Sequence, residues 1–400
     1  AAKSIDYFGA GTVEFLLDED KNFYFQEMNT RLQVEHPLTE MVTGHDLVAM
    51  QFHVAQGYSL PLAQEQLALD GHAIEVRLYA EDTATEFLPA TGTAHAWFPP
   101  EGAGIRVDHG LANGQEISPF YDPMVAKIIA WGEDRDIARR RLVRALENTT
   151  LFGFATNREF LIDLLQREAF AAGVATTAFI SENYPSGSFQ PEGCSALHMA
   201  IAACLLYRAS FAQSRDRALG TLPDMSGFTG TRELREHFRF GEEDSPTDVF
   251  VDEIKPSRYR VTIAENTFEL DWLHQDGGTL RLSVDSVQLT ARYALPGRGD
   301  VIVQLRGTTA ELTNQLAFTR GDETAGGSGT IAAPMHGNLM EVFVRVGDRV
   351  ETGQDVAVME AMKMEHRKST PVAGEVVAVH AVAGEQIASG AIVLEIQEQD

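Results

Sequence analysis

Acidic and amide side chains near the N-terminus form the first pattern that could do chemistry. Residues 12–17 and 23–28 each alternate apolar and polar positions on either side of a polar turn, which predicts a β-hairpin. Counting back from the turn places Glu14 across from Glu27, or nearly so. Two facing carboxylates repel each other unless a cation lies between them, and Mg²⁺ or Mn²⁺ prefers such oxygen ligands. Asn29 is the next candidate ligand, although a pair of solvated surface glutamates is favoured on spacing alone.

A second pattern lies near the C-terminus, where Lys363 is flanked by Met362 and Met364. One motif occurs on both sides of it, because residues 333–356 recur as 370–393 at a constant offset of 37 positions. Each copy consists of short β-branched runs separated by Gly and Pro, which predicts two halves of a small flattened barrel or sandwich. Pseudo-two-fold symmetry then puts Lys363 on a hairpin at one end. An isolated Met-Lys-Met is usually an exposed lysine with flexible filler, but the repeat makes Lys363 a candidate functional residue.

Composition limits the partners and the size of the cores. The chain has 400 residues, 44% of them apolar, so two to three domains with real cores are expected. Its net charge of −26 argues against nucleic acid and against an anionic membrane surface, and no apolar run approaches the length of a membrane span. Cys194 and Cys204 lie about 15 Å apart along a predicted helix, so they cannot pair with each other. Reduced thiols suit a cytosolic-type compartment. The sequence opens without Met or signal peptide, as expected for a piece of a longer chain.

Several longer patterns must position these residues. Residues 134–146 predict a helix whose arginines are interpreted as a solvated face, and 184–191 have the composition of a linker. A single helix is expected over 193–217, apolar nearly all round in its first half and therefore buried. Residues 248–316 alternate as successive strands, so the helix is expected to pack in or against an antiparallel barrel. Residues 321–329 are Gly-rich, which predicts a flexible tether.

Several segments carry a family resemblance. Residues 27–37, Glu-Met-Asn-Thr-Arg-Leu-Gln-Val-Glu-His-Pro, resemble the signature of biotin carboxylase, an ATP-grasp enzyme. The resemblance continues through 71–82, 121–124 and 155–158, which includes Asn157. Residues 358–366, Val-Met-Glu-Ala-Met-Lys-Met-Glu-His, resemble the biotin-attachment motif of biotin carboxyl carrier domains. The related lipoyl carriers usually have Asp-Lys-Ala at this turn. The resemblance therefore implies that Lys363 carries covalent biotin.

The resemblance also implies how ATP would be bound. Glu14, Glu27 and Asn29 would hold the Mg²⁺ or Mn²⁺ ions that bridge the ATP phosphates and neutralise charge as the phosphoryl group leaves. An ATP-grasp enzyme also needs a Gly-rich phosphate loop, and none precedes Glu14. The chain of 400 residues is therefore expected to lack half of the ATP site.

The same resemblance implies a bicarbonate and biotin site. Arg31, Gln33 and the Val34 backbone would bind bicarbonate, since a guanidinium fork suits a planar oxyanion. Glu35 would be the base that deprotonates bicarbonate before it attacks the γ-phosphate. Arg77 would stabilise the enolate-like ureido oxygen of biotin, the role of an oxyanion hole.

The expected fold is multidomain α+β. Residues 1–185 would be the C-terminal part of an ATP-grasp biotin carboxylase, and 192–320 a mediator domain of helix plus antiparallel β-barrel that binds the partner subunit. Residues 321–329 would be a flexible linker. Residues 330–400 would be an all-β biotin carboxyl carrier domain with a pseudo-two-fold repeat.

The function implied is that of the biotin-bearing alpha subunit of an acyl-CoA carboxylase. The middle region is too short for the large barrel of a pyruvate-carboxylase-like chain, so a separate carboxyltransferase beta subunit is expected. Residues 77–89 look closer to the 3-methylcrotonyl-CoA and geranyl-CoA group. The alternatives are a propionyl-CoA or acetyl-CoA carboxylase alpha subunit, or a non-catalytic biotinyl or lipoyl carrier module.

The remaining expectations concern ligands, partners and location. Biotin, ATP and Mg²⁺ or Mn²⁺ would be the cofactors, and bicarbonate a substrate. Biotin protein ligase would modify the chain, which would join a large hetero-oligomer that binds neither nucleic acid nor membrane. The location would be the cytoplasm, or the mitochondrial matrix in a eukaryote.

Overall fold

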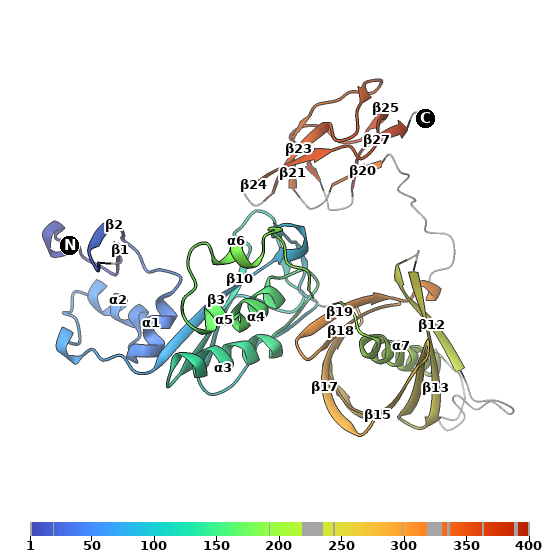
Figure 1. Cartoon of the computed structure of the whole chain (residues 1–400), viewed down its shortest axis with the longest axis horizontal. Helices are drawn as coiled ribbons and strands as arrows, with labels where there is room; N and C mark the ends of the chain where they lie inside the picture. Colours follow the sequence, from blue (N-terminus) through green and yellow to red (C-terminus); the bar gives the residue numbers. More distant parts are fainter. Residues whose placement is uncertain are drawn as a thin grey trace.

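The computed structural model describes most of the chain. The described residues are 2–18, 20–191, 193–217, 235–242, 245–297, 299–317, 330–333, 337–361, 364–387 and 391–398. Three bodies follow one another along the sequence in Figure 1: a mixed α and β region, a barrel around one helix, and a small β-sandwich. The predicted tether at 321–329 lies outside the described residues. No helix in the described ranges is long and apolar enough to cross a membrane.

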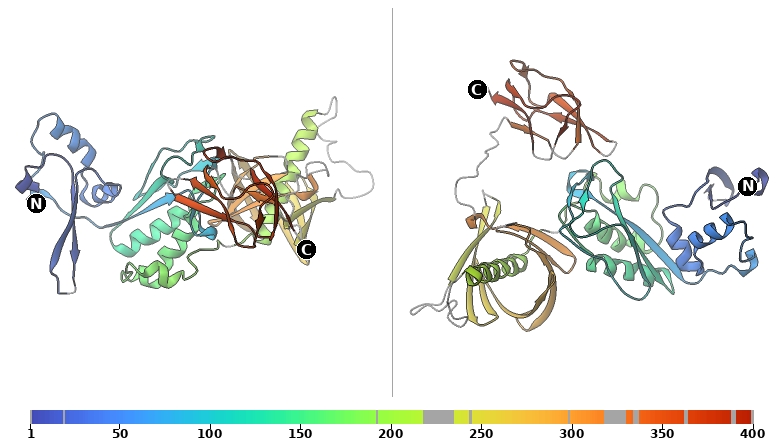
Figure 2. Two further views of the ribbon diagram at one scale, coloured as in Figure 1. Left: turned by 90° about the horizontal axis from the view of Figure 1, so that it is seen from above. Right: turned by 180° about the vertical axis from the view of Figure 1, so that it is seen from behind.

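The chain begins with a hairpin and two short helices. As predicted, two strands pair antiparallel through a polar turn, and Figure 2 shows this hairpin standing away from the central sheet. Its large side chains are solvent-exposed, with 70% of both Leu17 and Phe23 accessible, so cross-strand pairing supplies most of its local order. The elements are η1 (Ala2–Ile5), β1 (Thr12–Leu17), β2 (Phe23–Asn29), α1 (His36–Thr43), α2 (Leu47–Ala55) and η2 (Gln64–Gln66).

A three-stranded antiparallel sheet forms the centre of the first body. β10 (Met124–Gly132) lies between β3 (His72–Tyr79) and β8 (Ile105–His109). Side chains alternate across a strand, so the two faces differ in character. One face, with Ile74 and Ile128, packs against α3 (Arg135–Asn148) and α4 (Arg158–Gln166) in a common apolar core, and the other carries charged side chains.

Short elements complete this body. They are β4 (Glu81–Asp82), η3 (Thr83–Thr85), β5 (Leu88–Pro89), β6 (Gly92–Thr93), β7 (Ala96–Phe98), β9 (Glu116–Ile117), β11 (Thr150–Phe152), α5 (Glu168–Ala171) and α6 (Phe179–Asn183).

The prediction that the arginines of α3 form a solvated face is wrong for three of them. Arg135 Nη1 donates to the Ala171 carbonyl at 2.9 Å, and Arg139 Nη1 to the Leu165 carbonyl at 3.2 Å. Arg141 Nη1 donates to the Trp131 carbonyl at 2.7 Å. The first two acceptors lie in the last turns of α5 and α4, where helix carbonyls lack intrahelical partners. A guanidinium on a long stem reaches such carbonyls while its methylenes stay packed.

The prediction that 184–191 is a linker is also wrong, because this segment packs back onto the first body. Tyr184 is 6% exposed, and its hydroxyl donates to Asp163 Oδ2 at 2.5 Å. The rings of Tyr184 and Phe189 both pack edge-on against Phe160. The Phe189 amide donates to the Thr83 carbonyl at 2.7 Å. The residues between the two aromatic residues are Pro, Ser and Gly, so the composition of the segment did not indicate this contact.

A barrel around one helix forms the second body. α7 (Ala196–Arg217) lies inside a curved eight-stranded antiparallel sheet whose strands follow chain order (Figure 1). The helix is buried from Ala200 to Tyr207 and packs against Val249, Leu270 and Val303, which confirms the buried helix and the barrel. The strands are β12 (Arg235–Glu242), β13 (Ser245–Lys255), β14 (Arg258–Ile263), β15 (Asn266–Asp276), β16 (Thr279–Val284), β17 (Val287–Ala294), β18 (Asp300–Leu305) and β19 (Thr308–Thr313), with η5 (Gln315–Ala317) after them.

The C-terminal body is a sandwich of two four-stranded sheets, in the orders β20-β27-β25-β22 and β24-β23-β21-β26. The bounds of β21, β22 and β23 recur 37 positions later as those of β25, β26 and β27, which confirms the predicted repeat. Strand irregularities recur at the same offset, at Leu339/Glu341 and at Val376/Ala378. The strands are β20 (Thr330–Ala332), β21 (Gly337–Val342), β22 (Arg349–Val350), β23 (Asp355–Ala361), β24 (Met364–Ser369), β25 (Gly374–Val379), β26 (Gln386–Ile387) and β27 (Ile392–Glu398).

Candidate active site

The two carboxylates of the N-terminal hairpin converge on one donor. Glu14 and Glu27 are register partners, which confirms the pairing predicted from the turn. Asn29 Nδ2 donates to Glu14 Oε1 at 2.8 Å and to Glu27 Oε1 at 2.9 Å. An oxygen from each carboxylate therefore faces a single point. A hard cation could replace the amide N–H group there once the Asn29 side chain turned its oxygen inward.

The donor set restricts how such a cation could be held. Nowhere in the described ranges do three His, Cys, Asp or Glu side chains form a group suited to a metal ion. The cation would thus depend on two carboxylates, the Asn29 amide and oxygens of its substrate, a pattern typical of Mg²⁺ beside phosphates. Gln33 Nε2 also donates to Glu14 Oε1, at 3.0 Å, and links this pair to the next loop.

That loop, between β2 and α1, presents the predicted bicarbonate residues. Arg31, Gln33 and Glu35 all line one cavity of about 840 Å³, together with parts of the segment 7–12 and of α2. Arg31 and Glu35 are solvent-exposed, so both charges are accessible to a small anion. The structure therefore places three of the predicted residues at one hollow.

Glu35 and Arg77 form an ion pair between this loop and β3. The side chains are 52% and 37% exposed. Arg77 Nη1 also approaches the Tyr79 hydroxyl at 3.5 Å, and this contact, followed by the Glu35 carboxylate, raises the pKa of Arg77 although partial burial opposes the rise. The predicted base and the predicted oxyanion stabiliser are thus direct neighbours, and the guanidinium stays charged.

Asn157 fixes the strand that carries Arg77. It is 6% exposed, its Oδ1 accepts from the Tyr79 amide at 2.9 Å, and its Nδ2 donates to the Arg77 carbonyl at 3.2 Å. A buried amide that satisfies both a donor and an acceptor of the strand end holds that backbone in one position. Its position far along the chain gave no sign of this role beyond the resemblance.

The charged face of the central sheet holds a row of three residues. Lys127 of β10 is the register partner of Arg77 on β3 and of Asp108 on β8. Lys127 Nζ donates to the Val34 carbonyl at 3.0 Å and lies 3.4 Å from Asp108 Oδ2. A sheet lysine therefore contacts the backbone of the loop between β2 and α1 directly.

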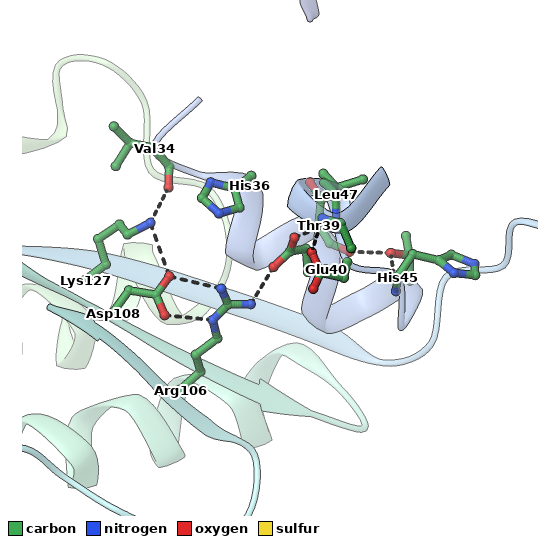
Figure 3. A network of polar contacts seen from close by, with 12 residues as sticks. Val34, His36, Thr39, Glu40, His45, Leu47, Arg106, Asp108 and Lys127 are labelled. Carbon is green, nitrogen blue, oxygen red and sulfur yellow. Dashed lines mark hydrogen bonds and ion pairs between the residues drawn. The ribbon is translucent and has the colours of Figure 1, made fainter. Parts of the chain in front are cut away.

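The row continues to α1 through a second ion pair. Arg106 donates to both oxygens of Asp108, at 2.8 and 3.1 Å, and its Nη1 reaches Glu40 Oε2 at 2.6 Å. Figure 3 shows the connected side chains running from the Val34 carbonyl to Glu40. Burial works against ionisation of Asp108, but Arg106 and Lys127 outweigh it and hold the pKa of this carboxyl below its usual range.

Glu75 lies among these charges without a matched partner. It is on the same face of β3 as Arg77, and no described residue hydrogen-bonds its buried Oε2 atom. Burial raises the pKa of Glu75 to about 7; Lys127 and Arg77 oppose the rise, and Glu35 and Asp108 add to it. A carboxyl group between two cations thus stays partly protonated near neutral pH.

Two neighbouring residues have local structural roles. Asp82 caps η3, because its Oδ1 accepts from the Ala84 amide at 3.0 Å. His36 starts α1, and its Nδ1 lies 2.8 Å from the Gln33 carbonyl. This contact agrees with a role in shaping the loop.

The strands around the predicted biotin site form the expected hairpin. β23 pairs antiparallel with β24, and Ala361 is the register partner of Met364, so two residues of sequence separate this last pair. Lys363 itself lies outside the described residues. The hairpin is at the junction of the two repeats, as the sequence predicted.

Three family models match parts of the chain. The family described as "Biotin carboxylase C-terminal domain" matches residues 75–182, and "Biotin-requiring enzyme" matches 329–396. "Carbamoyl-phosphate synthase L chain, ATP binding domain" matches residues 1–63. Methylcrotonoyl-CoA carboxylase subunit alpha of Dictyostelium discoideum is 36% identical over 391 residues, covering 94% of this chain and 56% of that protein. Nearly the whole of this chain is thus similar to one part of a carboxylase subunit.

Two further carboxylases are similar to this chain. The propionyl-CoA carboxylase alpha chain of Homo sapiens is 34% identical over 418 residues, covering 99% of this chain and 56% of that protein. The biotin carboxylase domain of a thermophilic 2-oxoglutarate carboxylase bound to bicarbonate is 42% identical, with a TM-score of 0.46, covering 47% of this chain and 43% of that one. The chain spans little more than half the length of the curated relatives it matches. The predicted fold class, with its carboxylase part, barrel and all-β carrier, is confirmed.

Several residues of this candidate site are absent from the sequence-based prediction. They are the members of the charged row and its supports: Glu40, Glu75, Arg106, Asp108, Lys127 and Asn157. Arg106 and Asp108 alternate with apolar residues in β8, which is a signal of one charged sheet face, whereas Lys127 is the single charged residue of β10. The strand order that brings them together is not visible in that alternation.

Proposed function

We propose that this chain is part of the alpha subunit of an acyl-CoA carboxylase, in which bicarbonate and ATP load CO₂ onto biotin attached to Lys363. The observation that carries the proposal is the pairing of Glu35 with Arg77 beside the Arg31 cavity, in a chain that also has a carrier hairpin around Lys363. A carrier module by itself would need the hairpin but not the base, the cation and the oxyanion cavity.

In this proposal Glu35 accepts the proton of bicarbonate. Arg31 holds the anion through its guanidinium, while Gln33 and the Val34 backbone complete the contacts. The bicarbonate oxygen then attacks the γ-phosphate of ATP, and the bond to the ADP oxygen breaks. The carboxyphosphate formed in this way would break down to CO₂ and phosphate. Biotin, when bound, supplies the ureido nitrogen that would lose its proton to phosphate, or indirectly to Glu35, and receive the CO₂.

Glu14, Glu27 and Asn29 are the proposed metal ligands. Their two carboxylate oxygens already face one point, and the repulsion between them is at present relieved by the Asn29 amide. A bound Mg²⁺ or Mn²⁺ would relieve it more strongly and would neutralise phosphate charge.

Arg77 must leave Glu35 to serve as oxyanion stabiliser. Both side chains are more than a third exposed, and exposed ion pairs contribute only about 0–1 kcal/mol, so the pair is inexpensive to open. Separation would free the carboxylate for its proton and the guanidinium for the ureido oxygen in one movement. The ion pair is thus a resting arrangement of two groups that act on different substrates.

The proposed partner is a carboxyltransferase beta subunit, and the proposed acyl substrate is 3-methylcrotonyl-CoA or geranyl-CoA. The alpha subunits of methylcrotonoyl-CoA and propionyl-CoA carboxylases match at nearly equal identity, so support for the branched unsaturated substrate comes from residues 77–89. Reconstitution with the beta subunit and comparison of these substrates with propionyl-CoA tests it. Equal or greater turnover of propionyl-CoA would reject the assignment.

The carrier half of the proposal is tested by intact mass. Coexpression of this chain with biotin protein ligase should add the mass of one biotinyl group, and Lys363→Arg should abolish the addition. A lipoyl adduct, or biotin retained in Lys363→Arg, would contradict the assignment.

The enzyme half is tested in the intact subunit, because the curated relatives extend beyond the matched region. Bicarbonate-dependent ATP cleavage with free biotin should fall by about 10²-fold or more in Glu35→Gln, the typical contribution of a general base. Biotinylation of Lys363 should be unchanged in the same variant, which shows that its carrier domain still folds. Full ATP cleavage in Glu35→Gln would remove this residue from the role of base.

A further inference from the structure

The loop between β2 and α1 carries the proposed bicarbonate residues, and we call it the bicarbonate loop. This loop and the helix that follows it are attached to the central sheet at two points. The first is the Val34 carbonyl, which accepts from Lys127 Nζ at 3.0 Å. The second is Glu40 in α1, which accepts from Arg106 Nη1 at 2.6 Å. Glu35 and His36 lie between these two points. The short stretch that carries the proposed base is therefore held from both sides by one face of the sheet.

One connected set of charges supplies both attachments. Lys127 and Arg106 share Asp108, with N–O distances of 3.4 and 2.8 Å. We call Lys127, Asp108, Arg106 and Glu40 the anchor network (Figure 3). Side-chain exposure is 13% for Lys127 and 9% for Glu40, so screening by solvent is weak at both ends of the network. Partly buried, charge-assisted hydrogen bonds of this kind are stronger than exposed ones.

We propose that Lys127 is a positioning residue for carboxylation: with the rest of the anchor network, it fixes the Val34 carbonyl and thereby holds the loop that presents the Glu35 carboxylate to its substrate. This inference rests on the proposed function. Arg77 is the register partner of Lys127, so the sheet that carries the cation also sets the position of the base.

The physical reason lies in the chain geometry. Glu35 projects from an exposed loop, and its ion pair with Arg77 is too solvent-exposed to hold the loop by itself. A peptide carbonyl one residue before Glu35 has little freedom once Lys127 and the first turn of α1 both constrain it. Misplacement of a reacting group by about 1 Å can cost on the order of 10²-fold in rate, so the loss of this constraint should be measurable.

The first test is hydrogen–deuterium exchange of this chain, which requires no ATP site. Lys127→Met removes the ammonium and retains a similar side-chain length. Amide exchange in residues 32–38 should become faster, with the His36 amide, which donates to the Gln33 carbonyl at 3.3 Å, as the reporter. The matched control is Arg140→Met, which removes an exposed cation from α3 in the same body. Unchanged exchange in Lys127→Met would overturn the proposal.

The second test is steady-state kinetics of bicarbonate-dependent ATP cleavage in the intact subunit. Lys127→Met should lower kcat/KM for bicarbonate by roughly 10- to 100-fold, and Lys127→Arg should recover part of the loss. The kcat/KM of Asp108→Asn should lie between those of the two Lys127 variants, because this change loosens Lys127 and Arg106 but leaves both in place. A faster-exchanging loop with unchanged bicarbonate kinetics in Lys127→Met would also overturn the positioning role.

Loss of Lys127 also changes the surroundings of Glu75, so the two effects must be separated. Glu75 is faced by Lys127, Arg77, Glu35 and Asp108. Lys127→Met in a Glu75→Gln background removes the titratable group, and the kinetic loss should persist there. Its disappearance would reassign the effect of Lys127 to the protonation of Glu75. If wild-type subunit shows no bicarbonate-dependent ATP cleavage, the proposed function fails, whereas the attachment of the loop is decided by exchange alone.

Discussion

At the scale of single residues, the site combines exposed reacting groups with buried supports. Glu35 and Arg77 are accessible to substrates, whereas Asn157 and Lys127 are mostly covered and hold backbone groups beside them. This division has a physical basis, since a reacting carboxylate must exchange partners, while a group that fixes a carbonyl gains strength from reduced solvent. The same burial raises the pKa of two partly buried acids, Glu75 on β3 and Glu81 just after it.

Glu81 provides a stability test of this burial. Desolvation, and then the charge of Asp122, raises the pKa of Glu81 from 4.5 to about 7 in the folded state. Between these values the folded protein holds a proton that the unfolded chain releases, so the contribution of Glu81 to stability falls as pH rises through this window. Glu81→Gln should therefore gain stability relative to wild type between about pH 5 and pH 8, on the order of 1 kcal/mol because part of the side chain is screened.

Denaturant unfolding at several pH values measures this difference. The control is Glu116→Gln, an exposed glutamate at the edge of the same body, whose effect should not change with pH. A difference between Glu81→Gln and wild type that stays constant over the range would show that the carboxyl group is not desolvated.

At the scale of elements, contacts made after the last helix of the first body determine how that body ends. Tyr184 and Phe189 close over Phe160, which also packs against Phe87. Arg167 lies over the Tyr184 ring at 5.1 Å. The two rings of this segment pack on Phe160, and its tyrosine hydroxyl is buried, so the segment behaves as part of the core. Its Pro and Gly residues are nevertheless typical of a connecting loop.

Tyr184→Ala tests this packing. Removing the ring creates a cavity beside Phe160 and leaves Asp163 without the hydroxyl donor, so unfolding free energy should fall by about 3 kcal/mol. Limited proteolysis should then cut within 184–191 much faster than in wild type. Tyr121→Ala, at a ring that is 78% exposed, is the matched control and should change neither quantity. Unchanged cleavage of Tyr184→Ala would mean that the segment is already open in solution.

At the scale of the whole molecule, the carboxylase part and the barrel share a small core. Ala96, Phe152 and Ile302 form one buried cluster across the boundary. The Thr150 hydroxyl donates to Gln304 Oε1 at 2.5 Å, and Gln304 Nε2 donates to the Thr149 carbonyl at 2.8 Å. These polar groups are nearly fully buried and satisfied, so separating the two bodies would expose both apolar surface and polar groups that lose their partners.

Arg158 makes a second contact across this boundary, and its replacement tests whether the two bodies unfold as a coupled unit. It is 4% exposed, and its Nη2 donates to Thr309 Oγ1 at 2.9 Å and to Glu159 at 3.1 Å. Arg158→Met removes the cation beside the Glu159 carboxylate, and breaking a buried pair in this way costs about 3–5 kcal/mol. Calorimetry should show the transition of the first body move to lower temperature and separate from that of the barrel.

The control for this experiment is Arg281→Met, which removes an exposed arginine from the barrel away from the boundary. Its transitions should match those of wild type. If Arg158→Met unfolds with the wild-type profile, the two bodies are not coupled through this contact.

The sequence by itself determined the features that depend on local periodicity. The register of Glu14 with Glu27 followed from one short turn, the buried helix from its apolar surface, and the carrier sandwich with its central hairpin from a 37-residue repeat. Each of these is set by residues close in the chain, so alternation and spacing suffice to predict it.

Only the tertiary structure decided the arrangement around the proposed base. Lys127, Asp108 and Glu40 come from three separate elements, and their contacts depend on strand order and on the position of α1. The packing of 184–191 and the roles of the α3 arginines likewise depend on partners distant in sequence. A charged or aromatic side chain has the same local pattern whether it faces solvent or a buried partner, and only the folded neighbours distinguish the two.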